Sequence, residues 1–285
     1  MRSIARLKND LSFNKTLEEM IDILKITTAV QLRRLQDERK REGRFLSQLH
    51  DSFSILKKGK AVNHPFFQRD REEPCCIVVI TSDEGFLGEL NSLLMNTALK
   101  EKNSGNDTLI VLGERGANYL DGLQEPYLFF SGIGEKVESS EADNLKRYLS
   151  EKYLKGQFNR VLIVYAEFVS ISVQQIKVHM LLPVPVLELP FSPEDAGRKE
   201  EIIIEPSSEA IIEGLMNLNL NYTIYNIFYS SKLSEFSARL MHLEKSSQEL
   251  VCINRKLFLE YYKNLHFIAD KRIREVLAAR TLIRK

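Results

Sequence analysis

The sequence predicts an α/β protein: a long antiparallel coiled coil of N- and C-terminal helices plus a Rossmann-like α/β domain with a mainly parallel sheet. Three observations lead to this expectation. All eight prolines of the 285-residue chain lie between Pro65 and Pro206, so both ends lack the strongest helix breaker. An apolar heptad repeat runs through the C-terminal end. Short β-branched runs alternate with helical segments in the middle. We therefore expect helices within 1–60 and 207–285, and an α/β domain over 74–190.

The two terminal segments each carry one apolar stripe. In the first, apolar residues recur at helical spacing from Leu17 to Leu35, and the stripe continues to Leu56. In the last, alternate steps of three and four from Leu233 to Ile268 visit eleven positions, of which eight are apolar. Polar Asn254 and Asn264 on this seam are expected to help fix register. Because a whole domain separates the two segments, their helices can pack antiparallel and bury both stripes.

The middle segment alternates between strand and helix patterns. Continuous apolar strands separated by helices favour a mainly parallel sheet covered on both faces. The proline-rich stretch 184–206 is predicted to be a loop. The expected strands are 75–81, 108–112, 127–130, 160–165 and an edge strand at 173–183, and the expected helices are 90–102, 113–120 and 140–154.

Charge and composition exclude several classes of protein. The formal net charge of +1 combines two ends of +6 each, residues 1–60 and 220–285, with a centre of −11, which argues against a uniformly basic nucleic-acid coat. Three cysteines are too few for a disulfide framework, so a reducing compartment is expected. No apolar run reaches the roughly 20 residues that span a bilayer, so we expect no membrane span.

The sequence contains no recognisable catalytic, cofactor or metal site. The turns at 85–88 and 113–116 lack the lysine of a P-loop and the glycine spacing of a dinucleotide fold, and their acidic residues would repel phosphate. We therefore interpret these glycines as permitting tight strand-to-helix turns. No two histidines lie four residues apart, and adjacent Cys75 and Cys76 are too close in sequence to chelate one ion well. The chain is not expected to be an enzyme in its own right.

Several segments match the sequence patterns of one known protein family. The pattern Thr-Ser-Asp-Arg-Gly-Leu-Cys-Gly-Gly-Phe-Asn is similar to residues 81–91, where Ser82, Asp83, Gly85, Gly88 and Asn91 match. The pattern Ala-x-Lys-Leu-Arg-Arg-x-Gln is similar to 29–36. Further similar stretches occur in the family's order at 113–116, 165–170, 181–183, 205–207 and 234–241. Taken together, these segments resemble the gamma subunit of F-type ATP synthases, the central rotor shaft.

The resemblance implies a non-catalytic subunit whose coiled coil sits inside a hexamer of alpha and beta subunits. It also implies contacts with the epsilon subunit and the membrane c-ring, a peripheral place on the cytoplasmic face of the cell membrane, and no nucleic-acid partner. The family's C-terminal signature is only partly kept at 261–275, which indicates a diverged branch such as the alternate sodium- or proton-pumping F-type ATPases. The implied partner-contact residues are Lys25, Arg33, Arg34, Glu235 and Arg239.

Helical geometry adds one expectation about Arg239 and leaves two alternatives open. Arg239 lies off the heptad seam, so its guanidinium is expected to face a partner, where its planar fork can pair with a carboxylate. Reversing its charge is expected to leave the fold intact. The basic clusters also fit a coiled-coil protein that binds nucleic acid. The α/β domain also fits a small-molecule-binding module with a helical dimerisation arm.

Overall fold

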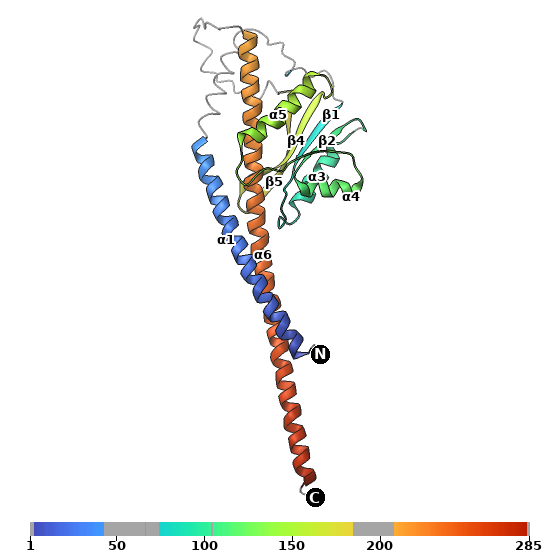
Figure 1. The fold of residues 1–285 in the computed structure, drawn as a ribbon, viewed down its shortest axis with the longest axis vertical. Helices are drawn as coiled ribbons and strands as arrows, with labels where there is room; N and C mark the ends of the chain where they lie inside the picture. The colour runs from blue at the N-terminus through green and yellow to red at the C-terminus, as the bar shows by residue number, and fades with distance from the viewer. Residues whose placement is uncertain (1–2, 43–65, 67–73, 104, 185–207, 284–285) are drawn as a thin grey trace. The chain divides into compact units, whose positions relative to one another are not determined.

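Two long helices and a five-stranded sheet make up the computed structural model, which describes residues 3–42, 66, 74–103, 105–184 and 208–283. The helices are α1 (Ile4–Glu42) and α6 (Ser208–Ile283), near the two ends of the chain (Figure 1). Neither contains proline, and Gly214 is the only glycine in either, so nothing in their sequences interrupts the backbone hydrogen bonds. The expected continuation of the first helix to residue 60 and the expected loop at 185–206 lie outside the described residues.

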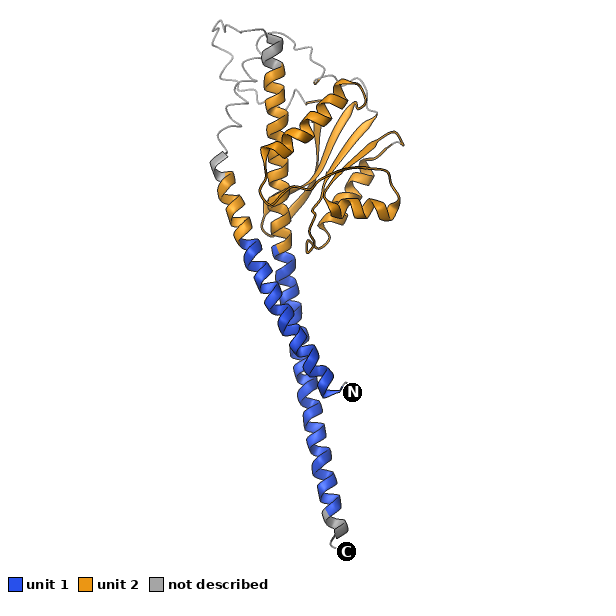
Figure 2. Cartoon of the chain, in the orientation of Figure 1, with its two compact units in different colours: residues 1–29, 240–285 blue, residues 30–239 orange. Residues whose placement is uncertain are grey.

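The chain divides into two compact units, and the division falls within the two long helices (Figure 2). The coiled-coil unit consists of residues 1–29 and 240–285, and the α/β unit of residues 30–239. Each long helix therefore contributes to both units.

The coiled-coil unit confirms the antiparallel pairing and the predicted seam. Asn14 of α1 donates a side-chain hydrogen bond to Asn254 of α6 at 2.8 Å, and Lys25 pairs with Glu244 at 2.6 Å. Since the partner number falls as the α1 number rises, the two helices run in opposite directions. The seam residues Leu243, Leu250, Leu257 and Asn264 are buried at seven-residue intervals.

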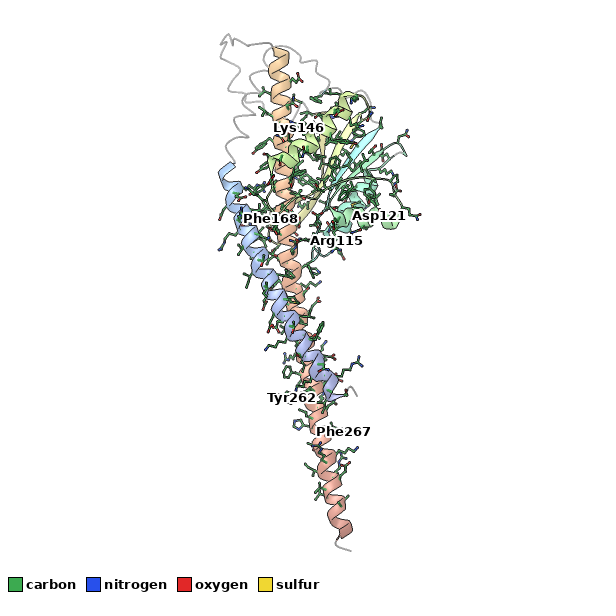
Figure 3. All side chains as sticks on the ribbon, viewed as in Figure 1. Arg115, Asp121, Lys146, Phe168, Tyr262 and Phe267 are labelled. Carbon is green, nitrogen blue, oxygen red and sulfur yellow. The ribbon has the colours of Figure 1, made fainter. Side chains whose placement is uncertain are left out.

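The coiled coil ends where α1 begins. Leu7, in the first turns of α1, is fully buried, whereas every described side chain of α6 from Leu265 to Ala279 is exposed. Tyr262 and Phe267 project from this part of the helix (Figure 3), and each is about half exposed. The end of α6 therefore presents apolar surface that nothing in the coiled-coil unit covers.

The sheet of the α/β unit has the order β3-β2-β1-β4-β5. Its strands are β1 (Cys75–Ile80), β2 (Thr108–Leu112), β3 (Leu128–Phe130), β4 (Arg160–Ser170) and β5 (Val173–Leu182). The first four are parallel, and β5 pairs antiparallel with β4 at the edge. The mainly parallel sheet is confirmed, although β4 runs five residues past its expected end because it forms a hairpin with β5.

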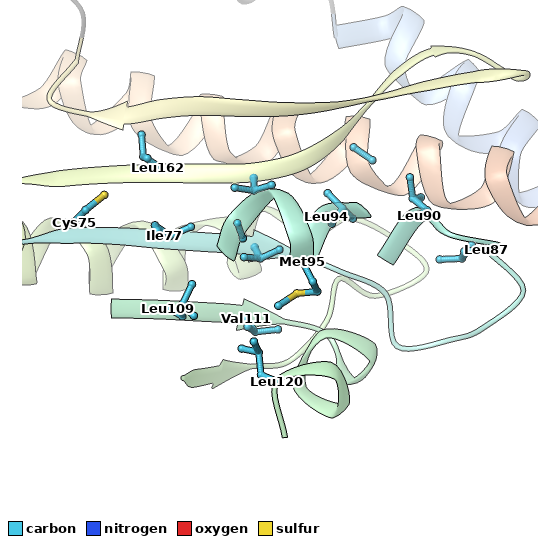
Figure 4. Close-up of a cluster of buried hydrophobic side chains, with 14 of the residues drawn as sticks. Cys75, Ile77, Leu87, Leu90, Leu94, Met95, Leu109, Val111, Leu120 and Leu162 are labelled. Atoms are coloured by element: carbon cyan, nitrogen blue, oxygen red, sulfur yellow. The ribbon is translucent and has the colours of Figure 1, made fainter. Parts of the chain in front are cut away.

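Helices cover both faces of the sheet (Figure 1). Helices α3 (Leu90–Glu101) and α4 (Glu114–Leu123) lie on one face, and α5 (Ser139–Leu154) and part of α6 lie on the other. Every residue of β1 is buried, as its continuous apolar sequence predicts for a central strand. Figure 4 shows the core beneath α3 and α4, which includes Ile77, Leu94, Met95, Val111 and Leu120.

Small hydroxyl side chains let α6 lie directly against β4. The Ser230 hydroxyl accepts a bond from the Phe168 backbone N–H at 3.1 Å, and the Ser234 hydroxyl donates to the Ala166 carbonyl at 2.9 Å. On another side of α6, Tyr229 donates its hydroxyl to the Leu35 carbonyl of α1 at 2.6 Å. Between residues 227 and 239 every side chain of α6 is buried, so this stretch of the helix is part of the domain core.

Candidate functional site

The loop after β1, residues 81–91, is closed by hydrogen bonds between its two ends. The Asn91 side chain accepts a bond from the Ser82 backbone N–H at 3.3 Å and donates one to the Ser82 hydroxyl at 2.9 Å. That hydroxyl donates to the Glu84 carbonyl at 2.8 Å. Within the loop, Phe86 and Gly88 adopt positive φ angles of 64° and 60°. This fixed backbone leaves the Phe86 side chain 58% exposed, so the loop presents an aromatic ring to its surroundings.

A carboxylate of the chain itself occupies the amino end of α4. Asp83 accepts a bond from the Glu114 backbone N–H at 2.9 Å, and a side chain at Gly132 would collide with the same carboxylate. The amino end of a helix beside the carboxyl edge of a parallel sheet is where α/β proteins commonly bind phosphate. Here Asp83 satisfies that position, and its charge would repel a phosphate.

The glycines at 113 and 116 act as turn residues, which agrees with their predicted role. Gly113 has a φ of 97°, and a Cβ there would lie 2.5 Å from the Thr81 carbonyl oxygen. A Cβ at Gly116 would lie 2.6 Å from Thr81 Oγ1, which accepts the Gly116 N–H at 3.0 Å. Glycine is required at both positions because the β2–α4 turn passes directly over the end of β1.

Metal ligands, thiols and membrane-spanning helices are the remaining candidates among the described residues. No three acidic, histidine or cysteine side chains among them gather in a way that could hold a metal ion. Cys75 and Cys76 are buried in β1, and burial raises the pKa of the Cys76 thiol well above its ordinary range. No described helix combines the length and apolarity needed to cross a bilayer.

Two of the predicted contact residues, Glu235 and Arg239, lie together on α6, and Arg239 binds the 81–91 loop. Arg239 pairs with Glu235 at 2.7 Å and with Glu84 of the loop at 3.1 Å. Its Nε also donates to the Gly85 carbonyl at 3.3 Å. Only 7% of the Arg239 side chain is exposed, whereas 69% of the Glu84 side chain is.

The expectation that the Arg239 guanidinium faces outward is therefore wrong for this structure. The heptad seam correctly identifies the side of α6 that packs on α1 in the coiled-coil unit. It carries no information about the α/β unit, where the sheet and its loops cover the remaining sides of the helix. Arg239 is used inside the chain, and the outward-facing group of this cluster is Glu84.

Arg33 and Arg34 lie on α1 within the α/β unit, and both are exposed. Arg34 pairs with Glu38, one turn along the helix, at 3.2 Å, with 66% of its side chain in contact with solvent. Among the described contacts, none joins either arginine to Arg239. The structure thus leaves this pair of cations open to solvent on a helix surface.

Lys25 belongs to the coiled-coil unit. It pairs with Glu244 of α6 at 2.6 Å, while Asp22 lies 3.9 Å away, and 24% of its side chain is exposed. The hydrogen bond from Lys25, together with a weaker contribution from Gln248, lowers the pKa of the Glu244 carboxyl. Lys25 therefore links the two helices of the coiled coil.

One functional-site residue was not identified from the sequence. Lys232 is buried on α6, donates to Glu235 at 2.9 Å and to the Ile133 carbonyl at 3.1 Å, and lies 5.2 Å from the centre of the Phe236 ring. The available signal was the spacing of Lys232, Glu235 and Arg239, which places three charges on one face of an otherwise uncharged stretch of helix.

The α/β unit also contains a pocket of about 420 Å³ between α1, α6 and the β4–β5 hairpin. Its lining includes Arg39, Tyr165, Glu167, His179 and Tyr222. Of its side chains, Tyr165 is largely buried, and this burial, followed by the nearby Glu167 carboxylate, raises the pKa of its hydroxyl. The pocket lies over the face of the hairpin and is separate from the 81–91 loop.

Comparisons with known proteins agree along almost the whole chain. Residues 3–264 match the family model ATP-synt, described as ATP synthase. The ATP synthase gamma chain of Desulforamulus reducens is 25% identical over 282 residues, which cover 97% of this chain and 98% of that one. The gamma chain of Desulforudis audaxviator is 27% identical over 248 residues and covers 82% of this chain and 83% of its own length.

Solved structures share the fold. The rotor of the Euglena gracilis mitochondrial ATP synthase superposes with a TM-score of 0.67 at 18% identity, over 93% of this chain and 98% of that one. The central stalk and c-ring structure from Tetrahymena thermophila gives a TM-score of 0.59 at 22% identity, over 80% and 99% of the two chains. At these identities the structural likeness establishes the fold alone.

Proposed function

The chain belongs to the ATP synthase family, whose gamma chains match it over nearly its full length, and on this premise we propose that it is the central-stalk rotor subunit of an F-type ATP synthase. In this role it couples ion translocation through the membrane ring to ATP synthesis or hydrolysis in an alpha-beta hexamer. The subunit itself is non-catalytic, and the nucleotide chemistry takes place in its partners.

One observation supports this proposal most strongly: the antiparallel coiled coil continues into a single helix end whose apolar side chains are exposed. Beyond Asn264, side chains such as Ile273, Val276 and Leu277 are more than half exposed. A contiguous apolar surface of this kind marks a protein contact. An enclosing ring of alpha and beta subunits would cover the end of α6, and the hydrogen-bonded Asn14–Asn254 pair would hold the two helices in register as the shaft turns.

The exposed cations supply the polar part of the proposed contact. Arg33 and Arg34 can each make paired hydrogen bonds to an acidic segment of a catalytic subunit, at little cost because among the described contacts the competitor is the partly exposed Glu38, which pairs with Arg34. Lys25 can exchange Glu244 for a partner carboxylate in the same way. Glu235 and Arg239 contribute indirectly, by holding the 81–91 loop so that Glu84 and Phe86 face a partner.

The mechanism follows from the shape of a rigid, asymmetric rod inside a ring of similar sites. Each orientation of the rod presents different side chains to each catalytic subunit, so each subunit favours a different conformation and nucleotide affinity. Rotation by the c-ring would then exchange these conformations in order. The α/β unit would contact the epsilon subunit and the ring, as a peripheral part of the membrane complex, and we place it on the cytoplasmic face.

Reconstitution tests the proposal. The full chain, mixed with alpha and beta subunits from the same source, should form a stable complex with several nucleotide-binding chains per copy and with sustained ATP hydrolysis. The chain alone should show no ATP turnover. Failure to join the hexamer, or turnover by the isolated chain that a point change in it abolishes, would contradict the proposal.

The two alternatives make different predictions in the same preparation. A nucleic-acid-binding coiled coil would bind DNA with a steep dependence on salt. A small-molecule module would show ligand protection of the pocket beside Tyr165 and Tyr222 against hydrogen exchange. The match of the chain to gamma chains over both helices and the α/β domain favours the rotor over both.

A further inference from the structure

A charge network, centred on the buried side chains of Lys232, Glu235 and Arg239, joins two separate loops of the sheet to helix α6. It starts at the Ile133 carbonyl, in the loop after β3, which accepts a bond from Lys232 Nζ at 3.1 Å. Lys232 pairs with one oxygen of Glu235 at 2.9 Å, and Arg239 pairs with the other at 2.7 Å. Arg239 then reaches Glu84 at 3.1 Å in the loop after β1. Every link is a charged or charge-assisted contact.

The surroundings of this charge network strengthen its contacts and fix its geometry. The side chains of Lys232, Glu235 and Arg239 are 8%, 11% and 7% exposed, so water screens them little. Both cations also lie beside the fully buried ring of Phe236, Lys232 at 5.2 Å and Arg239 at 5.5 Å from its centre. The middle carboxylate has one oxygen for each cation, so Glu235 holds Lys232 and Arg239 in fixed positions relative to each other.

We propose that Lys232, through Glu235 and Arg239, is a positioning residue for torque transfer: it fastens the carboxyl edge of the sheet to the shaft helix so that force on the loops turns α6. This inference rests on the proposed rotor function. The loops after β1 and β3 contact each other, because Asp83 packs against Gly132. Helix α6 therefore binds both of these touching loops: Lys232 bonds to the Ile133 carbonyl in the loop after β3, and Arg239 bonds to the Gly85 carbonyl in the loop after β1.

The geometry explains why a lysine serves at position 232. One ammonium group satisfies a backbone carbonyl of the β3 loop and a carboxylate of its own helix, with hydrogen bonds in two directions. A neutral side chain of similar length, such as methionine, would leave the Ile133 carbonyl and one Glu235 oxygen without this donor. The two loops would then be attached to α6 on one side only.

Lys232→Met tests the proposal in the assembled, membrane-reconstituted complex, with Lys232→Arg as the conservative variant. Lys146→Met is the matched control: Lys146 on α5 (Figure 3) pairs with Asp143 at 2.7 Å with the same three-residue spacing but joins no loop to α6. The readouts are ions pumped per ATP hydrolysed against a rising opposing gradient, and hydrogen exchange of the amides at 84–86 and 132–134.

For Lys232→Met, we expect normal coupling without load, about a twofold or larger loss of ions per ATP at the highest gradient, and about tenfold faster exchange in both loops. Lys232→Arg should restore most of the coupling under load and most of the protection of the two loops against exchange. Lys146→Met should match wild type in both measurements. A purely structural role would lower the yield of complex and leave ions per ATP unchanged under load. That result, in complexes that assemble normally, would overturn the proposal.

A second variant keeps the test decisive if Lys232→Met does not assemble. Glu84 is 69% exposed, so Glu84→Gln should fold. It weakens the contact between Arg239 and Glu84, the outermost contact of the charge network. It should show a smaller loss of coupling under load and faster exchange at 84–86. Unchanged values for Glu84→Gln would then overturn the proposal. If the rotor function itself is wrong, the wild-type chain will fail to form a pumping complex at all, which is a distinct result.

Discussion

Charge reversal at Arg239 should strongly destabilise the α/β unit, and not leave the fold intact as the heptad position of this residue suggested. The guanidinium is 7% exposed and pairs with Glu235, itself 11% exposed, at 2.7 Å. Arg239→Glu places a second carboxylate beside Glu235, and the one buried cation that remains, Lys232, already pairs with Glu235 at 2.9 Å. The new carboxylate is therefore buried without a cation of its own, and breaking a buried ion pair in this way costs about 3–5 kcal/mol. Breaking the Glu84 contact adds a smaller, still measurable amount to this cost, since water screens a side chain that is 69% exposed.

This loss is a large part of a typical total stability of about 5–15 kcal/mol. For a unit of roughly 150–250 residues, each 1 kcal/mol shifts the melting temperature by about 2–4 °C, so Arg239→Glu should lower it by about 6–20 °C. The sequence contains no tryptophan, so melting is best followed by circular dichroism of the full chain.

Arg34→Glu is the matched control for this measurement. Arg34 also pairs with a glutamate at four-residue spacing, Glu38 at 3.2 Å, but 66% of its side chain is exposed. Reversal there should change stability by no more than about 0.5–1 kcal/mol. Equal melting temperatures for Arg239→Glu and Arg34→Glu would refute the inference that burial gives the Arg239 pair its strength.

Three further predictions concern other parts of the chain. Asn14→Ala should cost about 1 kcal/mol by leaving the Asn254 amide without its partner, and a double-mutant cycle between the two positions should give a coupling energy of about 0.5–1.5 kcal/mol. Gly132→Ala should cost about 1–3 kcal/mol in thermal unfolding, because its methyl group would collide with a loop carboxylate. Exposed Cys252 should react with iodoacetamide at pH 8 in the folded chain, whereas Cys76 should react only after unfolding.

The raised pKa of the Cys76 thiol also fixes a direction of pH dependence. The unfolded chain releases this proton near the ordinary thiol pKa of about 8.5, while the folded chain keeps it. The contribution to stability is therefore complete below that pH and falls as the pH rises above it. A Cys76→Ala variant should lose less stability between pH 8 and pH 10 than wild type, and equal losses would contradict this assignment.

The predictions for Gly132 and for the Asn14–Asn254 pair each have an outcome that would contradict them. Gly122→Ala in α4 meets nothing within 4 Å, so it should be neutral or stabilising by up to about 1 kcal/mol. A cost at Gly122 equal to that at Gly132 would remove the steric explanation. A coupling energy near zero between Asn14 and Asn254 would mean that their hydrogen bond does not form in solution.

The backbone arrangement was largely predictable because its signals are local. The absence of proline from both ends predicts the long helices, and the apolar runs at 75–81 and 108–112 predict buried parallel strands. The polar seam residue Asn254 predicted a register-fixing contact, and its bond to Asn14 confirms it. The predicted strand at 160–165 covered only the run RVLIVY, whereas the hairpin extends β4 and places Glu167 opposite Gln175 and beside Lys177.

The candidate site was less predictable, because burial in the α/β unit depends on tertiary contacts. An apolar stripe locates one buried side of a helix, but α6 is buried on all sides between residues 227 and 239. This is why Arg239 was expected to face outward and why Lys232 was not singled out. The resemblance to the family marked the 81–91 loop and the 234–241 segment of α6, and the structure joins these two segments through Arg239.

Single-molecule rotation tests most directly whether this chain turns inside its complex as ATP is hydrolysed. A probe attached through Lys155→Cys, at the exposed end of α5, in a Cys252→Ala background would report motion of the α/β unit in a complex whose alpha-beta hexamer is fixed to a surface. The rotor account predicts stepwise rotation in one direction that needs ATP and stops when nucleotide is removed. A probe that stays stationary while the same complexes hydrolyse ATP would contradict it.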